Sequence, residues 1–252
     1  MKIVFDHVCA SYGKKPILQD ISFCARPGAI TALVGRNGAG KTTLIRCLTG
    51  EKSHGGRIFL DTQNLAELTV RQRAGQIACL PQALPRPHVT VEELVLFGRA
   101  PHTPFFGHFS EKDKLAAARA MEQAGISHLA HAFVDTLSGG ERRKAFFAMV
   151  LAQDTPVIVL DEPTAHLDLV SRFEFGALLQ SVCRSTGKTF LLIMHDLTDV
   201  LRYADRIAVL HESKIVFDGT SDEFLTQDIA SDLFHVRIRG NREEGFSLSP
   251  SP

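Results

Sequence analysis

Short apolar stretches separated by glycine, proline and polar residues dominate the first third of the chain. They predict strands over residues 2–10, 19–26, 30–34, 57–60 and 77–80. Pro27 and Gly28 mark a turn between the second and third of these strands. From Thr90 onward the apolar positions take a helical spacing, which predicts one helix beginning near Val91 and an alanine-rich helix over residues 111–124.

The apolar pattern changes again in the second half of the chain. Residues 157–160 and 190–194 are two short, fully apolar runs on either side of a predicted helix over 171–185. Such runs are typical of parallel strands that are buried on both faces, so the pattern predicts an α/β fold. Charge, serine and proline dominate after Gly240, and we expect residues 236–252 to be partly disordered.

Composition narrows the class of protein only a little. Lys plus Arg and Asp plus Glu number 28 each, so no overall basic field favours nucleic acid as the main partner. The five cysteines are scattered, which argues against a disulfide framework or a zinc site and favours the reducing cytoplasm. No apolar run approaches the roughly 20 residues of a membrane span, so any membrane role is expected to be peripheral. His102, His108, His128 and His131 lack acidic or cysteine partners at ligand spacing.

The most informative motif follows the predicted strand over 30–34. Residues 35–42 fit the pattern G-x-x-x-x-G-K-[ST], in which glycines let backbone amides meet phosphate oxygens. We expect Lys41 to place its charge on the β and γ phosphates and the Thr42 hydroxyl to bind Mg²⁺. The helix expected to begin here adds the positive end of its dipole. The candidate nucleotide-binding residues of this loop are Asn37, Gly38, Ala39, Gly40, Lys41, Thr42 and Thr43.

Two carboxylates follow the apolar run 157–160. Asp161 would hold Mg²⁺ directly or through water, as a carboxylate at the tip of a parallel strand beside a phosphate loop can do. Glu162 projects the other way and could polarise a water for attack on the γ phosphorus. The alternative is that both acids simply close a strand at the protein surface.

A helix cap later in the chain suggests a second anion site. Ser138 and Glu141 fit a capping box that begins a helix over 142–153. A cap alone does not explain Gly139 and Gly140, because each glycine weakens a helix by about 1 kcal/mol relative to alanine. We therefore expect a group to approach this backbone closely. Two phosphate sites for one nucleotide type suggest a pocket shared between two chains.

Taken together, these motifs resemble the nucleotide-binding subunit of an ATP-binding cassette transporter over residues 1–235. The resemblance identifies residues 137–141 as the signature motif, which meets the γ-phosphate held by a partner subunit. It implies that Tyr12 stacks on adenine, that Gln82 contacts the metal and the attacking water, and that His195 binds the γ-phosphate. It also places Asp168 at the interface of a homodimer. The implied catalytic residues are Glu162, His195, Gln82 and Lys41, with ATP and Mg²⁺ as the bound groups.

The resemblance also implies an architecture and a location. Residues 1–82 and 157–235 would form a P-loop NTPase core with a mainly parallel sheet and an N-terminal antiparallel β subdomain. Residues 83–156 would form an inserted α-helical subdomain that carries the signature motif. The protein would work at the cytoplasmic face of the inner membrane with integral-membrane permease subunits and, indirectly, a substrate-binding protein.

The middle of the chain is similar to the ATPase subunits of importers for iron(III)-siderophores, haem and cobalamin. The similarity rests on residues 91–102, 105–107 and 110–113. We expect residues 99–109 to receive a cytoplasmic helix of the permease, unless Phe105, Phe106 and Phe109 fill a small satellite core instead. Alternatives are a soluble ATPase of an assembly pathway such as iron–sulfur cluster maturation, a nucleic-acid maintenance machine, and a regulator that no longer hydrolyses ATP.

Overall fold

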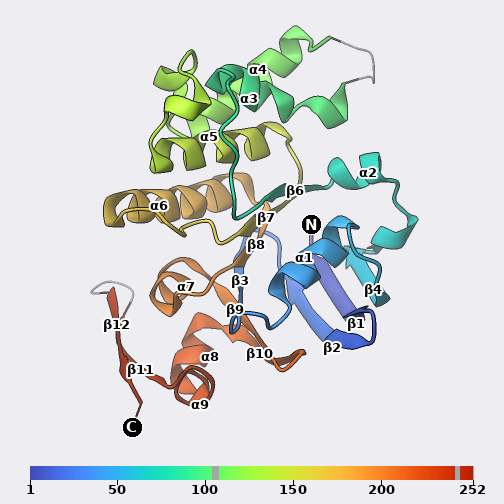
Figure 1. The fold of residues 1–252 in the computed structure, drawn as a ribbon, viewed down its shortest axis with the longest axis vertical. Coiled ribbons are helices and arrows are strands. Elements are labelled where there is room, and N and C mark those ends of the chain that lie inside the picture. The colour runs from blue at the N-terminus through green and yellow to red at the C-terminus, as the bar shows by residue number, and fades with distance from the viewer. Residues whose placement is uncertain (104–107, 242–244, 252) are drawn as a thin grey trace.

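A six-stranded, mainly parallel sheet forms the centre of the molecule (Figure 1). The fold is that of a computed structural model, which describes residues 1–103, 108–241 and 245–251. Neighbouring strands run parallel from β9 to β6, and only β10 is antiparallel. The strand order is β10 (Lys214–Thr220), β9 (Arg206–His211), β3 (Ile30–Val34), β8 (Thr189–Ile193), β7 (Val157–Asp161) and β6 (Ile77–Leu80).

The predicted strands of this sheet are confirmed, and two were missed. β3 and β6 have the predicted bounds, and β7 and β8 differ from them by one residue. The two strands that were not predicted are β9 and β10. β9 contains the apolar run 207–210, which is fully buried, so this strand carries the same sequence signal as β7 and could have been predicted. β10 mixes apolar and charged side chains, and its Asp218 pairs with Arg206 of β9 at 2.8 Å. Such cross-strand pairing is specified by tertiary contacts and leaves a weak local pattern.

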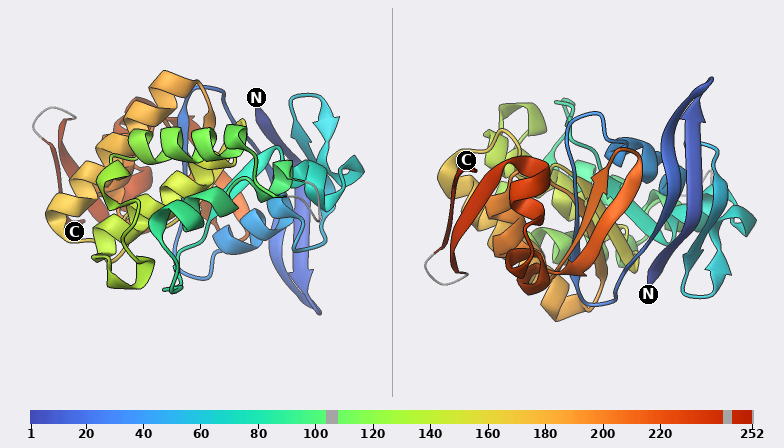
Figure 2. Two further views of the ribbon diagram at one scale, coloured as in Figure 1. Left: turned by 90° about the horizontal axis from the view of Figure 1, so that it is seen from above. Right: turned by 90° about the horizontal axis from the view of Figure 1, so that it is seen from below.

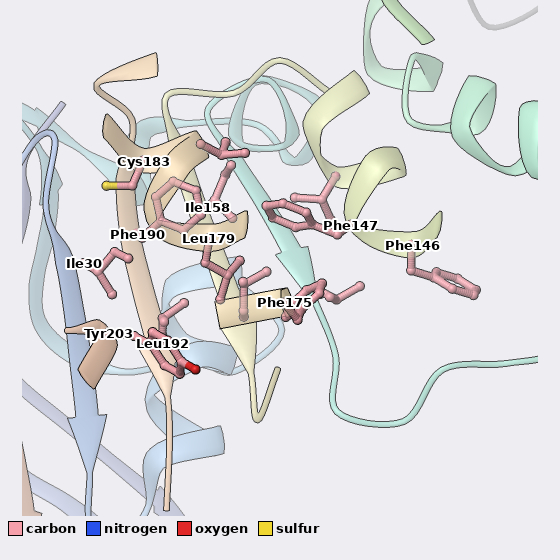
Figure 3. Close-up of a cluster of buried hydrophobic side chains, with 14 of the residues drawn as sticks. Ile30, Phe146, Phe147, Ile158, Phe175, Leu179, Cys183, Phe190, Leu192 and Tyr203 are labelled. Carbon is pink, nitrogen blue, oxygen red and sulfur yellow. The ribbon is translucent and has the colours of Figure 1, made fainter. Parts of the chain in front are cut away.

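Apolar side chains cover both faces of the central sheet, which explains its fully apolar strands. In β7, Ile158 and Leu160 belong to one buried cluster, whereas Val157 and Val159 belong to another on the opposite face. The same alternation holds in β8. Figure 3 shows the first cluster, where Phe190 lies near residues of the helices that cover this face. Parallel strands buried in this way lose the polar alternation of a half-exposed sheet.

A second, antiparallel sheet lies on the other side of helix α1 (Lys41–Thr49). Its strand order is β2 (Lys15–Ala25), β1 (Ile3–Tyr12), β4 (Gly55–Leu60) and β5 (Gln63–Asn64). Leu44 and Leu48 of α1 are fully buried with Phe5 of β1 and Leu33 of β3. Burial between the two sheets therefore holds α1, and with it the loop that precedes it.

Helices of the middle segment lie beyond the edge strand β6, above the sheet in Figure 1. They are α3 (Val91–Phe97), α4 (Glu111–Gln123) and α5 (Gly139–Ala152). The short α2 (Val70–Ala74) precedes β6 and lies beside it. Capping boxes begin α3, α4 and α5 at Thr90, Ser110 and Ser138. The segment expected to bind a permease helix, residues 99–109, includes residues 104–107, which lie outside the described residues.

Helix α6 (Leu169–Thr186) packs between α5 and the sheet. Its Phe175 ring contacts Phe147 of α5 edge to face, with the ring centroids 5.5 Å apart. Helix α7 (Leu197–Tyr203) follows β8, and the two views of Figure 2 show α6 and α7 on the same side of the sheet. This layered arrangement confirms the predicted α/β fold class with a parallel core, an antiparallel N-terminal sheet and an inserted helical segment.

The C-terminal segment differs from the expectation of disorder. After helices α8 (Ser221–Thr226) and α9 (Ile229–Phe234), β11 (Val236–Asn241) pairs with β12 (Gly245–Pro250) in an antiparallel hairpin. Val236, Ile238 and Phe246 are partly buried against the main core, and β12 lies beside α7. The polar composition of this segment concealed the apolar side chains that pack: Val236 and Ile238 alternate along β11, and Phe246 lies on β12. Among the described residues, no helix is both long and apolar enough to cross a membrane.

Candidate active site

The loop between β3 and α1 is shaped by glycines at places where a side chain would not fit. A Cβ at Gly35 would lie 2.3 Å from the carbonyl oxygen of Leu210, so the backbone of this loop touches β9. Gly40 has φ of 111° and a Cβ there would lie 2.9 Å from Leu18. Positive φ values of this kind favour glycine. The first and last glycines of the motif are therefore required by packing and by backbone conformation.

The N-terminus of α1 is free of any side-chain cap. Gly40 occupies the N-cap position, and the first backbone bond of the helix runs from the Leu44 amide to the Gly40 carbonyl. The amides of the first turn consequently have no intrahelical acceptor. Such amides, together with the helix dipole, attract an anion. This geometry is what a phosphate-binding loop needs.

Lys41 lies beneath this loop. Its side chain is buried, and its Nζ donates to the carbonyl oxygens of Gly35 at 2.6 Å and Arg36 at 3.2 Å. Burial lowers the pKa of Lys41, while the nearby carboxylates of Glu162 and Asp161 act in the opposite direction. The ammonium group thus has neutral carbonyl partners that an incoming phosphate could replace with a charged one.

Glu162 lies between two of the other predicted catalytic side chains, Gln82 and His195. Its Oε2 accepts a hydrogen bond of 2.6 Å from Nε2 of Gln82 and lies 3.6 Å from Nδ1 of His195. Its backbone has φ of 47°, which is unusual for a residue other than glycine, and its amide donates to the carbonyl of Ile193. Strained backbone of this type clusters at functional sites. The three side chains come from the ends of three adjacent strands, β6, β7 and β8.

These groups line one cavity of about 470 Å³. The structure therefore brings together most of the phosphate loop with Gln82, Glu162 and His195. Asp161 is half-buried beside the cavity and does not line it, and Ala39 packs against the core beneath the loop. The residues that line the cavity are Ile17, Asn37, Gly38, Gly40, Lys41, Thr42, Thr43, Gln82, Glu162, Ile193 and His195.

Tyr12 lies outside the cavity lining, at the end of β1. The residue is 45% exposed, its hydroxyl accepts a hydrogen bond of 3.3 Å from Arg46, and the Lys52 ammonium lies 4.5 Å from the ring centroid. The hydrogen bonds with Arg46 and Thr43 lower the pKa of Tyr12. The ring is thus tied to α1, the helix that follows the phosphate loop, and remains accessible for stacking.

Ser138, Gly139 and Gly140 also lie away from the cavity lining. Ser138 caps α5: its Oγ accepts from the Glu141 amide at 3.3 Å and donates to Oε2 of Glu141 at 2.6 Å. The two glycines have different surroundings: a Cβ at Gly140 would lie 2.7 Å from Oγ of Ser171 in α6, whereas one at Gly139 would meet nothing within 4 Å. The smallness of Gly140 is therefore explained by helix packing. Only at Gly139 does the backbone face open space.

Sequence reasoning missed three side chains at this site. Ile17 and Ile193 line the cavity, but an isoleucine in a strand carries no functional signal. Arg143 of α5 is 5% exposed and donates to the carbonyl oxygens of Gln82 and Ala165 at 3.5 and 3.4 Å. A buried guanidinium in a helix otherwise rich in core residues is a signal that could have been noticed.

A phosphate loop on a parallel sheet, with paired acids at the tip of β7, defines a P-loop nucleotide-binding protein. A family model described as ABC transporter matches residues 18–165, more than half of the chain, so the chain belongs to the ABC transporter family. It is an ABC-type ATPase, a class whose members bind and hydrolyse ATP.

Known relatives include ATP-binding proteins of ferric-chelate and hemin transport. The chain is 37% identical to the ferric enterobactin transport ATP-binding protein FepC of Escherichia coli, over 92% of this chain and 86% of that protein. It is 36% identical to the hemin import ATP-binding protein HmuV of Burkholderia thailandensis, over 93% of each. Among solved structures, an ABC transporter of metal-chelate type in an inward-facing conformation aligns with a TM-score of 0.85 and 26% identity, covering 99% of this chain and 97% of that one.

Proposed function

We propose that this chain is the ATP-hydrolysing subunit of an importer for iron(III)-siderophore complexes or haem. The observation that carries the proposal is the Glu162 carboxylate, held by Gln82 and close to His195, at a cavity formed by the phosphate loop. The substrate class follows from relatives named for ferric enterobactin and hemin transport, each matching about nine-tenths of the chain.

In this proposal each side chain of the cavity has a separate task. The loop amides and Lys41 bind the phosphates, and Glu162 accepts the proton of the attacking water. Gln82 orients Glu162 through the 2.6 Å hydrogen bond, and His195 contacts the γ-phosphate. Tyr12, tied to α1 by Arg46, stacks on the adenine ring.

The donor set of the site fits Mg²⁺. The Thr42 hydroxyl, a Gln82 amide oxygen and the Asp161 carboxylate are the hard oxygen ligands that this ion prefers. Burial, and then the neighbouring Glu162 carboxylate, raise the pKa of Asp161, and a cation would offset both effects. When bound, Mg²⁺ would neutralise charge on the β and γ phosphates.

A homodimer would complete the site. Within one chain, Ser138 and Gly139 lie outside the cavity, and the backbone at Gly139 faces open space. We propose that this exposed helix start meets the nucleotide of a partner chain, so that ATP closes the dimer by binding the closed state more tightly. The residues 83–156 would then form a helical subdomain that carries this contact, attached to a core of residues 1–82 and 157–235.

The remaining partners belong to the same proposal. The chain would bind integral-membrane permease subunits at the cytoplasmic face of the inner membrane, and a substrate-binding protein would act indirectly through them. The test is to recover the tagged chain from gently solubilised membranes of its host. We expect a multi-span permease to come with it, and recovery with soluble partners alone would favour an assembly ATPase instead.

Replacing Glu162 by glutamine tests the chemical part of the proposal. Removing the proton acceptor should lower ATP turnover by about 10²–10⁴-fold, while ATP binding persists. Glu122, an exposed carboxylate on α4, provides a matched control, and Glu122→Gln should hydrolyse ATP normally. Rapid turnover by Glu162→Gln would overturn the assignment of Glu162.

A further inference from the structure

A polar network behind the cavity joins three segments that are separate in sequence. Arg172 of α6 donates from Nε to Oδ2 of Asp199 at 2.7 Å and from Nη2 to Oδ2 of Asp196. Oδ2 of Asp199 also accepts a hydrogen bond of 2.8 Å from the Thr164 hydroxyl. One guanidinium thus bridges two carboxylates, and one of these carboxylates reaches a third segment.

The network connects the two loops that bear the proposed catalytic side chains. Thr164 stands two residues after Glu162, in the loop that follows β7. Asp196 stands directly after His195 and caps α7 by accepting from Thr198 at 2.9 Å. Arg172 therefore fixes the loop of Glu162 and the loop of His195 to the same rigid helix, although its own side chain does not line the cavity.

Burial makes this link specific. Asp199 is 3% exposed, and burying a carboxylate is costly unless hydrogen bonds and a cation surround it, as the Thr164 hydroxyl and Arg172 do here. Arginine can direct two N–H groups at two different acceptors because its guanidinium is planar with fixed donor directions. A lysine at this position would keep the charge but serve the two carboxylates poorly. The geometry thus requires the planar guanidinium of arginine, and a positive charge alone is not sufficient.

The position of Glu162 is sensitive to such a link. Its backbone is held in the left-handed region, and its Oε2 lies 3.6 Å from Nδ1 of His195, just beyond hydrogen-bond reach. A small displacement of either loop would change this distance and the direction of the carboxylate. We propose that Arg172, through Asp199, Thr164 and Asp196, is a positioning residue that sets Glu162 and His195 for ATP hydrolysis. The inference rests on the roles proposed above for Glu162 and His195.

The first test compares Arg172→Lys with Arg206→Lys. Arg206 forms a partly buried pair with Asp218 at 2.8 Å, between β9 and β10, and serves as the matched control. Arg172→Lys should lower kcat by roughly 10–100-fold with KM changed less than about twofold, because misplaced groups slow the reaction without removing nucleotide contacts. Arg206→Lys should retain the wild-type kcat. A wild-type kcat for Arg172→Lys, or a loss confined to KM, would overturn the proposal.

The second test avoids any change of charge. Thr164→Val removes the hydroxyl with little change of shape, and Thr164→Ser restores it. The control is Thr155→Val, which removes another buried hydroxyl at the opposite end of β7, where it donates to Val157 at 2.8 Å. We expect kcat to fall about tenfold in Thr164→Val, to recover in Thr164→Ser, and to be unchanged in Thr155→Val. Failure of Thr164→Ser to recover would refute the positioning role.

A double-mutant cycle tests whether Arg172 and Thr164 act through one network or independently. The Glu162→Gln variant tests separately the role of Glu162 on which the inference rests. If Arg172 and Thr164 act through one network, the kcat losses of Arg172→Lys and Thr164→Val should be less than additive. Fully additive losses would contradict a shared link. Rapid turnover by Glu162→Gln would instead refute the proton-acceptor role of Glu162 in the proposed function, so the two failures are distinguishable.

Discussion

Gly35 offers a sharp test of how the phosphate loop is held against the sheet. A Cβ at this position would lie 2.3 Å from the carbonyl oxygen of Leu210 in β9, whereas ordinary contacts begin near 3.4 Å. Gly35→Ala therefore requires the loop and β9 to move apart by about 1 Å. Rotation cannot relieve the clash, since the atom it meets belongs to the backbone of a central strand.

Gly35→Ala is expected to reduce both the stability of the protein and its rate of ATP hydrolysis. Overpacking of this kind lowers the free energy of unfolding by about 1–3 kcal/mol. The shift also moves the Gly35 carbonyl, which accepts the 2.6 Å hydrogen bond from Lys41. A misplacement of about 1 Å at a reacting site can lower the rate about 100-fold, which corresponds to about 2.7 kcal/mol.

The assay compares ATPase kcat/KM and thermal unfolding of Gly35→Ala with those of Gly187→Ala. Gly187 ends α6 with φ of 64°, and a Cβ there would meet nothing within 4 Å. Gly187→Ala should therefore cost only the strain of a left-handed alanine, about 1 kcal/mol, and keep its ATPase activity. A wild-type kcat/KM for Gly35→Ala, or equal losses in both variants, would refute the reasoning.

Further changes probe other parts of the molecule. Lys41→Ala should weaken ATP binding at least about tenfold in calorimetry, and unchanged affinity would count against the phosphate cradle. Gly140→Ala should lower the unfolding midpoint because its Cβ would lie 2.7 Å from Oγ of Ser171. Gly139→Ala should leave the fold intact but reduce ATPase activity, and full activity would argue against the shared dimer site. Hydrogen bonds from Ser110 lower the pKa of Asp113 to about 2. The stability difference between wild type and Asp113→Asn should thus be full above about pH 4 and disappear as the pH falls through about 2.

Local sequence patterns identified the elements that carry the site. The phosphate loop, the strand ending in Asp161 and the cap at Ser138 were recognisable because each depends on residues a few positions apart. The apolar runs of β3, β7 and β8 predicted a parallel sheet because both its faces are buried. Strand β10 and the C-terminal hairpin escaped prediction, since their mixed polar patterns acquire meaning only from the neighbours they pack against. Strand β9 was also missed, although its buried apolar run 207–210 is a signal of the same kind as that of β7.

The chain by itself therefore determined the chemistry available for nucleotide binding: glycines, a lysine, a hydroxyl and two acids in a fixed local order. Only the tertiary structure decided which groups meet. Gln82 and Glu162 are 80 positions apart in sequence yet share a 2.6 Å hydrogen bond, because β6 and β7 are neighbours in the sheet. It also places Ser171 against Gly140, and it joins the loops that follow β7 and β8 through Arg172. Local patterns are encoded by short-range spacing, whereas these contacts arise from the packing of distant segments.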